Sequence, residues 1–304
     1  ANRPTADTKL QSGRYGISID LLADLADRAE TDLWLCVPGR LDEATVRAWA
    51  NVVRERLDDD RRLFLEVGNE VWNAIPPYEA QRRWMTAEAD RRGIFEDLDD
   101  YARGLMMHAV RTVEIGKTFE DVLGEDRVVV VLGQQVGMSY FHDLTAERLG
   151  DDRAAIKALA IAPYFGHGAG KLLGSVDDKA LLDALEAGLS ETLADVQESA
   201  DSAQRHGWPL IAYEGGQHLV PPGGWDATEA ARLQMKRVNE SEAMGELYRR
   251  WLAGWSEAGG GLMMHYGLVY QQDGRWGAWG LYRSMNEAAL PKATAYLEFA
   301  KPDK

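Results

Sequence analysis

Two glutamates, Glu70 and Glu214, occupy positions where a fold can use a carboxylate for chemistry. The first follows the segment LFLEV-Gly-Asn, and the second lies between the segment WPLIAY and two glycines. Short apolar runs of this kind are typical of strands buried on both faces of a parallel sheet. Polar residues at the carboxyl ends of such strands carry the chemistry of α/β folds. Two carboxylates placed there could hydrolyse a glycoside, one as acid and the other as nucleophile or base.

Two further polar residues lie in the first segment. Glu66 precedes Glu70 by four residues and is a rival for the acid, but its place inside the strand favours a paired, structural carboxylate deeper in the fold. Asn69 could simply shape the turn, or it could donate to a sugar 2-hydroxyl, a bond that strengthens in the transition state. We predict a catalytic role for Glu70 and Glu214 rather than a loop or helix-capping role, and a substrate-binding role for Asn69.

Composition restricts the partners of this chain. The net charge of −15 over 304 residues argues against a nucleic acid and fits a neutral or cationic ligand. No apolar run is long enough to cross a membrane. Most of the ten Trp and eleven Tyr must pack in the core, but several could line a sugar-stacking cleft. The chain begins at Ala1 without a methionine or signal peptide, so we expect that an upstream part was removed or not included. We also expect that the protein is secreted or periplasmic.

The cysteine and the histidines predict no metal and no cofactor. The single cysteine, Cys36, excludes an internal disulfide, and its place within LWLCV predicts a buried, inert thiol. The six histidines lack metal-ligand spacing. We expect His142 and His265, near strand ends, to touch substrate. Gln134 follows another apolar run and is a third candidate of this kind. The glycine-rich residues 166–170 lack the lysine of a phosphate loop and predict a flexible loop.

Apolar runs and helical periodicity alternate along the chain. We expect strands near residues 33, 63, 128, 160, 210 and 262. Helices are predicted over residues 17–29, from 42, over 77–92 and 98–118, near 178–205, from 227 and over 286–300, while residues 1–13 are polar and loop-like. This alternation predicts an α/β fold, a parallel sheet covered by helices, in a single domain over residues 1–304.

The two glutamate segments resemble clan A of the retaining glycoside hydrolases. The resemblance rests on Val67-Gly68-Asn69-Glu70 and Ala212-Tyr213-Glu214-Gly215. It implies a (β/α)8 TIM barrel, with Glu70 as acid/base after strand four and Glu214 as nucleophile after strand seven. It further implies that Tyr164 touches the nucleophile, that Trp279 stacks on sugar and that Glu66 is the interior glutamate of the clan. The implied substrate is a β-linked oligo- or polysaccharide, and the two carboxylates would lie about 5–5.5 Å apart.

The strand count departs from the clan pattern. Glu70 follows the second of six predicted strands and Glu214 the fifth, which is the right interval with an offset of two. We therefore expect the first one or two barrel strands to be missing from this chain, and an upstream segment or a second chain to complete the barrel. An open sheet would otherwise expose two edges.

Two alternatives to a hydrolase remain open. A non-catalytic carbohydrate-binding barrel would keep the cleft without turnover. A transglycosylase would use the same residues and differ in the access of water. Turnover of aryl β-glycosides separates the binding protein from the enzymes, and products formed with an added acceptor sugar separate the two enzymes.

Overall fold

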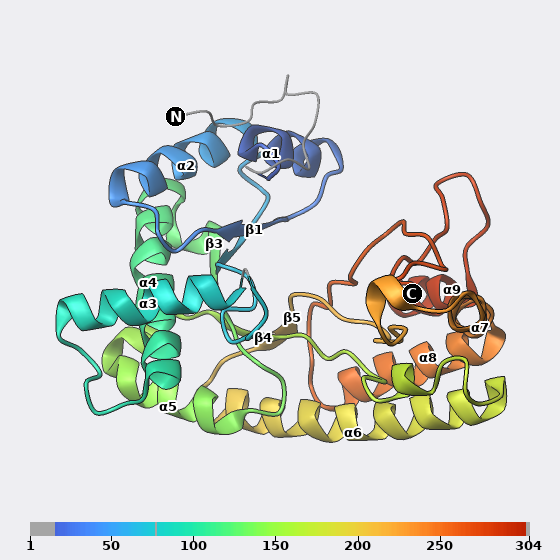
Figure 1. Cartoon of the computed structure of the whole chain (residues 1–304). Coiled ribbons are helices and arrows are strands. Elements are labelled where there is room, and N and C mark those ends of the chain that lie inside the picture. Colours follow the sequence, from blue (N-terminus) through green and yellow to red (C-terminus); the bar gives the residue numbers. More distant parts are fainter. Residues whose placement is uncertain (1–15, 77, 302–304) are drawn as a thin grey trace. The chain divides into compact units, whose positions relative to one another are not determined.

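The structure is a computed structural model that describes residues 16–76 and 78–301 (Figure 1). The predicted loop over residues 1–13 and Pro77, the first residue of one predicted helix, lie outside the described residues. The described strands are β1 (Leu33–Val37), β2 (Leu63–Val67), β3 (Val128–Gly133), β4 (Ala158–Ile161) and β5 (Leu210–Ala212). The described α-helices are α1 (Ile19–Arg28), α2 (Glu43–Arg56), α3 (Tyr78–Arg92), α4 (Asp100–Leu123), α5 (Ser139–Leu149), α6 (Asp178–Arg205), α7 (Glu229–Asn239), α8 (Glu242–Glu257) and α9 (Pro291–Phe299).

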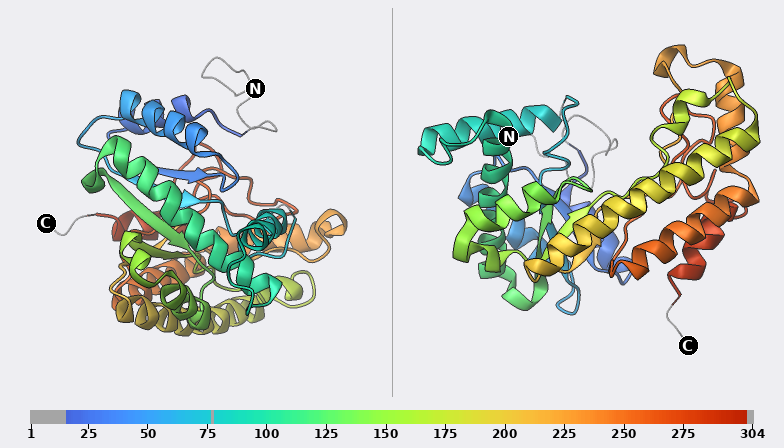
Figure 2. Two further views of the ribbon diagram at one scale, coloured as in Figure 1. Left: turned by 90° about the vertical axis from the view of Figure 1, so that its left-hand side faces the viewer. Right: turned by 90° about the horizontal axis from the view of Figure 1, so that it is seen from below.

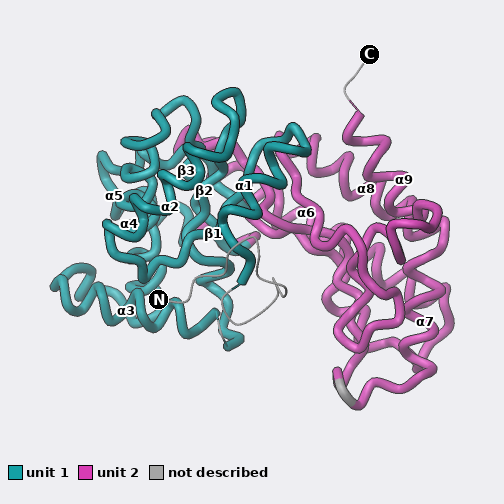
Figure 3. Tube along the Cα trace, turned by 90° about the horizontal axis from the view of Figure 1, so that it is seen from above, with its two compact units in different colours: residues 1–135, 140–160 teal, residues 136–139, 161–304 magenta. Residues whose placement is uncertain are grey.

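The chain divides into two compact units. Unit 1 comprises residues 1–135 and 140–160, and unit 2 comprises residues 136–139 and 161–304 (Figure 3). The single domain over residues 1–304 stays a prediction, and each unit is described by itself.

Unit 1 is built on parallel strands in which alternate residues point to opposite faces. The register pairs Leu35 of β1 with Leu65 of β2, and Leu65 with Val130 of β3. These three residues lie on one face, which the helices cover. Trp34 and Phe64 lie on the other face, where their rings stack in parallel with centroids 5.5 Å apart. One face therefore forms a helix-covered core, while the other carries aromatic and polar side chains.

Helix α4 is the main cover of this core. It packs against β2 and β3, and α2 and α3 pack against α4 in turn. A Cβ atom at Gly116 of α4 would come within 2.7 Å of a Val130 methyl group, so glycine allows the helix to approach the sheet closely. Asp42, the residue from which this helix is predicted, caps α2, since its side chain accepts a hydrogen bond from the Thr45 amide.

Unit 2 contains β5 and the long helix pair α6 and α8, which lie side by side (Figure 2). Helix α8 carries an apolar stripe whose members are all buried: Met244, Leu247, Tyr248, Trp251, Leu252 and Trp255. The amide of Tyr213 donates to the carbonyl of Ile161 at 3.2 Å, which links the end of β5 to the end of β4 within this unit. The strand order of the sheet follows the chain, β1-β2-β3-β4-β5.

Three expected elements differ in the structure. The closing helix expected over residues 286–300 begins only at Pro291. The helix expected from residue 227 is two helices, because Ser241 caps α8 by accepting a hydrogen bond from the Met244 amide. The strand expected near residue 262 is reduced to one parallel bridge between Ala212 and Met263. The described residues thus form five strands rather than six, and the missing barrel strands stay a prediction.

Truncation of Leu65 tests the core of unit 1. Leu65→Ala should lower the free energy of unfolding by about 2–5 kcal/mol, because the side chain is fully buried and leaves a cavity. Leu25→Ala is the matched control on α1, where the leucine is 61% exposed, and it should change stability by less than about 0.5 kcal/mol. Urea unfolding of both variants measures the difference. Equal effects would contradict the assigned sheet face.

Candidate active site

Glu70 lies where the chain turns out of the sheet after β2. The Gly68 amide still donates to the Val37 carbonyl at 2.8 Å, and this bond is the last of the β1–β2 ladder. Gly68 and Glu70 then adopt left-handed backbone conformations, with φ of 76° and 44°. The Asn73 amide donates to the Glu70 carbonyl at 2.8 Å and closes the turn. The half-buried Glu70 side chain therefore lies beyond the carboxyl end of β2, as predicted.

Asn73 holds the carboxyl group of Glu70. Its Nδ2 donates to Glu70 Oε2 at 2.8 Å, while its Oδ1 accepts from the Ile75 amide at 2.9 Å. Because an amide nitrogen can only donate and its oxygen can only accept, the Ile75 bond fixes which end of Asn73 faces Glu70. Sequence reasoning missed Asn73. The available signal was an amide three residues after Glu70, the spacing that closes a turn.

Asn69, the predicted ligand of a sugar hydroxyl, is half-buried beside Glu70. Its main-chain carbonyl accepts from Gln81 Nε2 at 3.3 Å, which connects the turn to α3. Its contact with substrate stays a prediction.

Glu66 is a second carboxyl group in the same segment, buried on the aromatic face of the sheet. Its Oε2 accepts hydrogen bonds from Trp34 Nε1 at 3.0 Å and Cys36 Sγ at 3.5 Å. Burial raises the pKa of Glu66 to about 7, and the nearby charge of Glu70 raises it further against the lowering effect of the two donors. A Cβ atom at Gly133 of β3 would come within 2.8 Å of Glu66 Oε1. The glycine at this position therefore leaves room for the carboxyl group.

The expectation of a buried Cys36 was wrong. Cys36 is exposed although it lies inside β1. Residues alternate across a strand, and Cys36 shares the face of Trp34 and Glu66 rather than the helix-covered face of Leu35. The apolar composition of the run therefore did not predict the burial of each residue in it.

Glu214 follows β5 in unit 2, where glycines let neighbouring groups come close. The Gly215 carbonyl accepts from the Tyr266 amide, and the Gly216 carbonyl from the Phe165 amide, both at 3.0 Å. A Cβ at Gly215 would lie 2.9 Å from the Trp251 ring, so a larger residue has no space there. The half-buried Glu214 side chain thus stands at the carboxyl end of β5, as predicted.

Unit 2 brings two predicted aromatic residues together. Tyr164 and Trp279 pack edge to face with centroids 5.6 Å apart, and Tyr266 and His218 each contact both rings. We call these four residues the aromatic cluster. The His167 ring lies 4.0 Å from the His218 ring. Burial and the neighbouring His167 lower the pKa of His218 to about 4, so this ring is neutral near pH 7.

Of the three remaining predicted residues, Gln134 and His142 are buried and His265 is half-buried. Gln134 is buried, and its Nε2 donates to Thr145 Oγ1 at 3.2 Å. His142 lies within α5 rather than at a strand end, is fully buried, and bonds to the Gln135 carbonyl through Nε2. His265 is half-buried and bonds to the Tyr248 hydroxyl, and burial lowers its pKa to about 3. Their contact with substrate stays a prediction.

A buried lysine, which no sequence pattern predicted, supports the loop that carries Trp279. Lys292 is fully buried at the start of α9. Its Nζ donates to Asn239 Oδ1 and Gln272 Oε1, both at 3.2 Å, and to the Ala278 carbonyl at 2.9 Å. Burial lowers the pKa of Lys292 to about 7. This network therefore ties residues 272–278 to α7 and α9.

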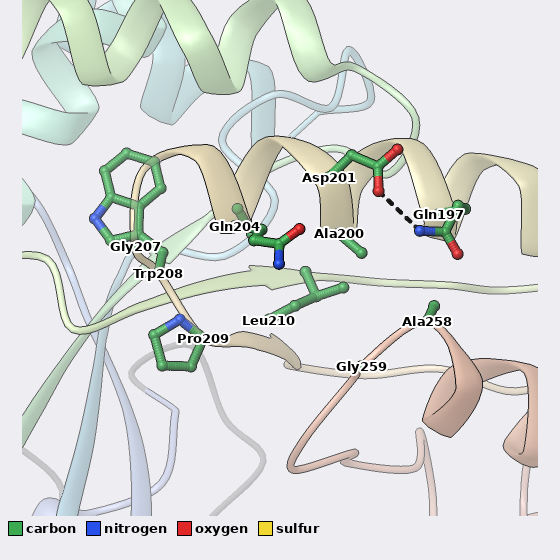
Figure 4. A pocket seen from close by; sticks show the side chains of 11 residues that line it. Gln197, Ala200, Asp201, Gln204, Gly207, Trp208, Pro209, Leu210, Ala258 and Gly259 are labelled. Carbon is green, nitrogen blue, oxygen red and sulfur yellow. Dashed lines mark hydrogen bonds between the residues drawn. The ribbon is translucent and has the colours of Figure 1, made fainter.

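A pocket of about 380 Å³ lies between α6 and the chain entering β5 (Figure 4). Trp208 and Leu210 line it together with Gln204. Beside them, Gln197 Nε2 donates to Asp201 Oδ1 at 2.8 Å. It lies at the amino end of β5, whereas Glu214 follows the carboxyl end. Because barrel enzymes place their chemistry at the carboxyl end, we assign this pocket no catalytic role.

Metal ligands and membrane-spanning helices were both expected to be absent, and residues 16–76 and 78–301 bear on each point. Among them, no group of three or more His, Cys, Asp or Glu side chains is arranged to hold a metal ion. No described helix is both long enough and apolar enough to cross a bilayer.

The raised pKa of Glu66 predicts a pH-dependent stability. Between its ordinary value of 4.5 and about 7, the folded protein holds a proton at Glu66 that the unfolded chain releases. The stability contributed by this group is therefore full below pH 4.5 and is lost as the pH rises through 7. Unfolding of the wild type and Glu66→Gln across this range should show the wild type losing stability relative to the variant. A pH-independent difference would contradict the assignment.

The lowered pKa of Lys292 predicts the opposite slope at higher pH. Between about 7 and 10.5, the unfolded chain holds a proton at this lysine that the folded protein lacks. The wild type should therefore gain stability relative to Lys292→Met as the pH rises through this window. Thermal unfolding at several pH values measures the gain. Lys179→Met is the control, at a lysine with an 82% exposed side chain whose pKa the hydrogen bond to Asp183 raises. It should show no such gain, because this lysine stays protonated in both states below its ordinary pKa.

Comparison with known proteins identifies the fold. No protein-family model matches the sequence, and no curated protein matches it significantly. Solved structures do match. A 4-O-α-L-rhamnosyl-β-D-glucuronidase from Fusarium oxysporum has a TM-score of 0.57 at 13% identity, covering 98% of this chain and 56% of that chain. A family 26 endo-β-1,4-mannanase from Cellulomonas fimi has a TM-score of 0.50 at 15% identity, covering 96% and 61%. The family 53 catalytic domain from Ignisphaera aggregans has a TM-score of 0.55 at 13% identity, covering 97% and 82%.

These structural neighbours are clan A glycoside hydrolases. The chain spans less than two thirds of the length of the first two. At these identities the similarity concerns the fold, so the predicted resemblance to the clan is confirmed at that level. The parallel α/β fold of this chain matches that of TIM-barrel glycosidases.

Proposed function

We propose that this protein is a retaining O-glycoside hydrolase that cleaves a β-linked glycan by double displacement. The observation that carries the proposal is the placement of two carboxylates in a fold that matches clan A glycoside hydrolases. Glu70 lies three residues beyond the end of β2, and Glu214 lies two residues beyond the end of β5. In barrel enzymes, residues at these strand ends perform the chemistry. No cofactor takes part in the proposed reaction.

In the first proposed step, Glu214 attacks the anomeric carbon and the glycosidic bond breaks. The departing oxygen takes a proton from Glu70. In the second step, Glu70 removes a proton from water, the water oxygen attacks the same carbon, and Glu214 leaves. Asn73 donates to Glu70 Oε2, so we place the transferred proton on Oε1. This assignment gives the two oxygens of Glu70 different tasks.

Carbohydrate is the substrate class that the aromatic cluster favours. Tyr164 and Trp279 pack against each other, and Trp279 Nε1 donates to the Trp276 carbonyl at 2.9 Å, which fixes its indole ring. Fixed aromatic faces bind the apolar faces of sugars at little entropic cost. In the proposal, Trp279 stacks on a sugar ring, Tyr164 holds Glu214, and Asn69 donates to the 2-hydroxyl group.

Turnover of an aryl β-glycoside panel tests the proposal. The wild type should release phenol from at least one member. Glu70→Gln should lower kcat by about 10²–10⁴-fold, because it removes the general acid. Glu214→Ala should abolish turnover, and azide should restore it by entering the vacated space as an external nucleophile. The rescued product should have the inverted anomeric configuration. Glu257→Gln, an exposed control at the end of α8, should behave as the wild type.

The pH–rate profile and the products separate the remaining alternatives. A catalytic pair should give an acidic and a basic limb, and Glu70→Gln should change the basic one. Full activity of Glu214→Ala would remove the nucleophile assignment. Sugar binding without turnover would indicate the carbohydrate-binding barrel. Transfer to an added acceptor sugar, in place of hydrolysis, would indicate the transglycosylase.

A further inference from the structure

One buried arginine from a neighbouring helix holds the loop that follows Glu70. Arg82 of α3 places its Nη1 at 3.2 Å from the Val71 carbonyl, 3.2 Å from the Trp72 carbonyl and 2.9 Å from the Asn73 carbonyl. The residue is only 9% exposed. Three successive carbonyls thus converge on a single guanidinium nitrogen, which fixes the path of residues 71–73.

The surroundings of Arg82 are built to receive it. Its guanidinium carbon lies 4.6 Å from the centroid of the Tyr101 ring, a cation–π contact. The Tyr101 hydroxyl donates to the Trp72 carbonyl at 3.0 Å, so it holds the same loop. A Cβ at Gly104 of α4 would come within 2.7 Å of Arg82 Cγ, so glycine makes room for the arginine stem. Helix α4 therefore fixes the arginine, and the arginine fixes the loop.

The loop in turn controls the carboxyl group of Glu70. Asn73 is the last of the three residues held by Arg82, and its Nδ2 is the donor to Glu70 Oε2. A shift of the Asn73 main chain by about 1 Å would lengthen that hydrogen bond beyond its useful range. Glu70 itself has a left-handed backbone, with φ of 44°, and depends on the surrounding contacts to stay there.

We propose that Arg82 is a positioning residue for Glu70, acting through the carbonyls of residues 71–73 and the side-chain amide of Asn73. The inference rests on the proposed function for its effect on rate. Its effect on the Glu70 carboxyl group follows from the contacts in unit 1. The plainer alternative is that Arg82 only stabilises the fold.

The decisive measurement is the titration of the Glu70 carboxyl carbon by NMR in protein labelled with ¹³C-glutamate, assigned with Glu70→Gln. A hydrogen bond from Asn73 favours the ionised carboxylate, so Asn73→Ala should move the titration midpoint upward by about one pH unit. Arg82→Met should move it in the same direction by a similar amount. The double variant should add little to the larger single effect, because both act through one contact. An unmoved midpoint in Arg82→Met would overturn the inference.

Two further variants separate positioning from folding. Arg83→Met is the matched control, because this neighbour on α3 has a 76% exposed side chain and pairs with Glu79. It should leave the Glu70 midpoint and the activity unchanged. Arg82→Lys keeps a charge and several donors, so it should fold even where Arg82→Met does not. Because a lysine lacks the planar fork, we expect it to restore only part of the wild-type midpoint. Where Arg82→Met does not fold, a midpoint in folded Arg82→Lys identical to the wild type would overturn the inference.

Kinetics then connect the inference to the proposed reaction. In an active enzyme, Arg82→Met should lower kcat about tenfold or more with little change in KM, and shift the basic limb of the pH–rate profile upward. An inactive wild type with the expected NMR shifts would overturn the proposed function and leave the positioning role intact. An active wild type whose basic limb is identical in Arg82→Met would overturn the positioning role alone.

Discussion

The left-handed backbone of Glu70 is the constraint on which the candidate site in unit 1 depends. With a φ of 44°, a residue that carries a Cβ occupies a conformation that costs about 1–2 kcal/mol. Gly68, with a φ of 76°, allows the chain to leave β2, but the carboxyl group has to come from a non-glycine residue. The strain at Glu70 must therefore be offset by the residues around it. Asn73 does so twice, through its main-chain amide and its side-chain amide.

The same turn places Glu70 near a second acid, Glu66, and their proximity affects the protonation of both carboxyl groups. Glu66 is buried beside Trp34 and Cys36, and the charge of Glu70 contributes to its raised pKa of about 7. Interacting carboxyl groups lose their protons as a pair, so the charge on each depends on the other. Glu66, which the sequence indicates as structural, can therefore also influence the protonation of Glu70. A proton on Glu66 would lower the cost of an ionised Glu70, as would the hydrogen bond from Asn73.

The sequence predicts most of the strands, and the placement of Glu70 and Glu214 after two of them, because both features depend on local patterns. Residues 63–67 are apolar on both sides of Glu66, and the structure places them in β2. The strand expected near residue 262 fails for a physical reason. Leu262, Met264 and Tyr266 are exposed, so the apolar composition there does not correspond to a buried strand. Arg82 was not predictable, because its partners are main-chain carbonyls, which every residue possesses. Its contact with residue 73 also joins two elements whose packing no local pattern describes.

In each unit, a buried basic side chain donates hydrogen bonds to carbonyl oxygens and so supports a loop at the candidate site. The two side chains, an arginine and a lysine, differ chemically. Arg82 holds residues 71–73 in unit 1, and Lys292 holds the Ala278 carbonyl in unit 2, next to Trp279. Arg82 offers a planar guanidinium group whose Nη1 serves three successive main-chain carbonyls. Burial lowers the pKa of Lys292 to about 7, so its charge changes within the working range of many enzymes. The neutral amine can still donate two hydrogen bonds, but it faces three acceptor oxygens and must leave one without its proton. Support of the loop before Trp279 therefore depends on pH.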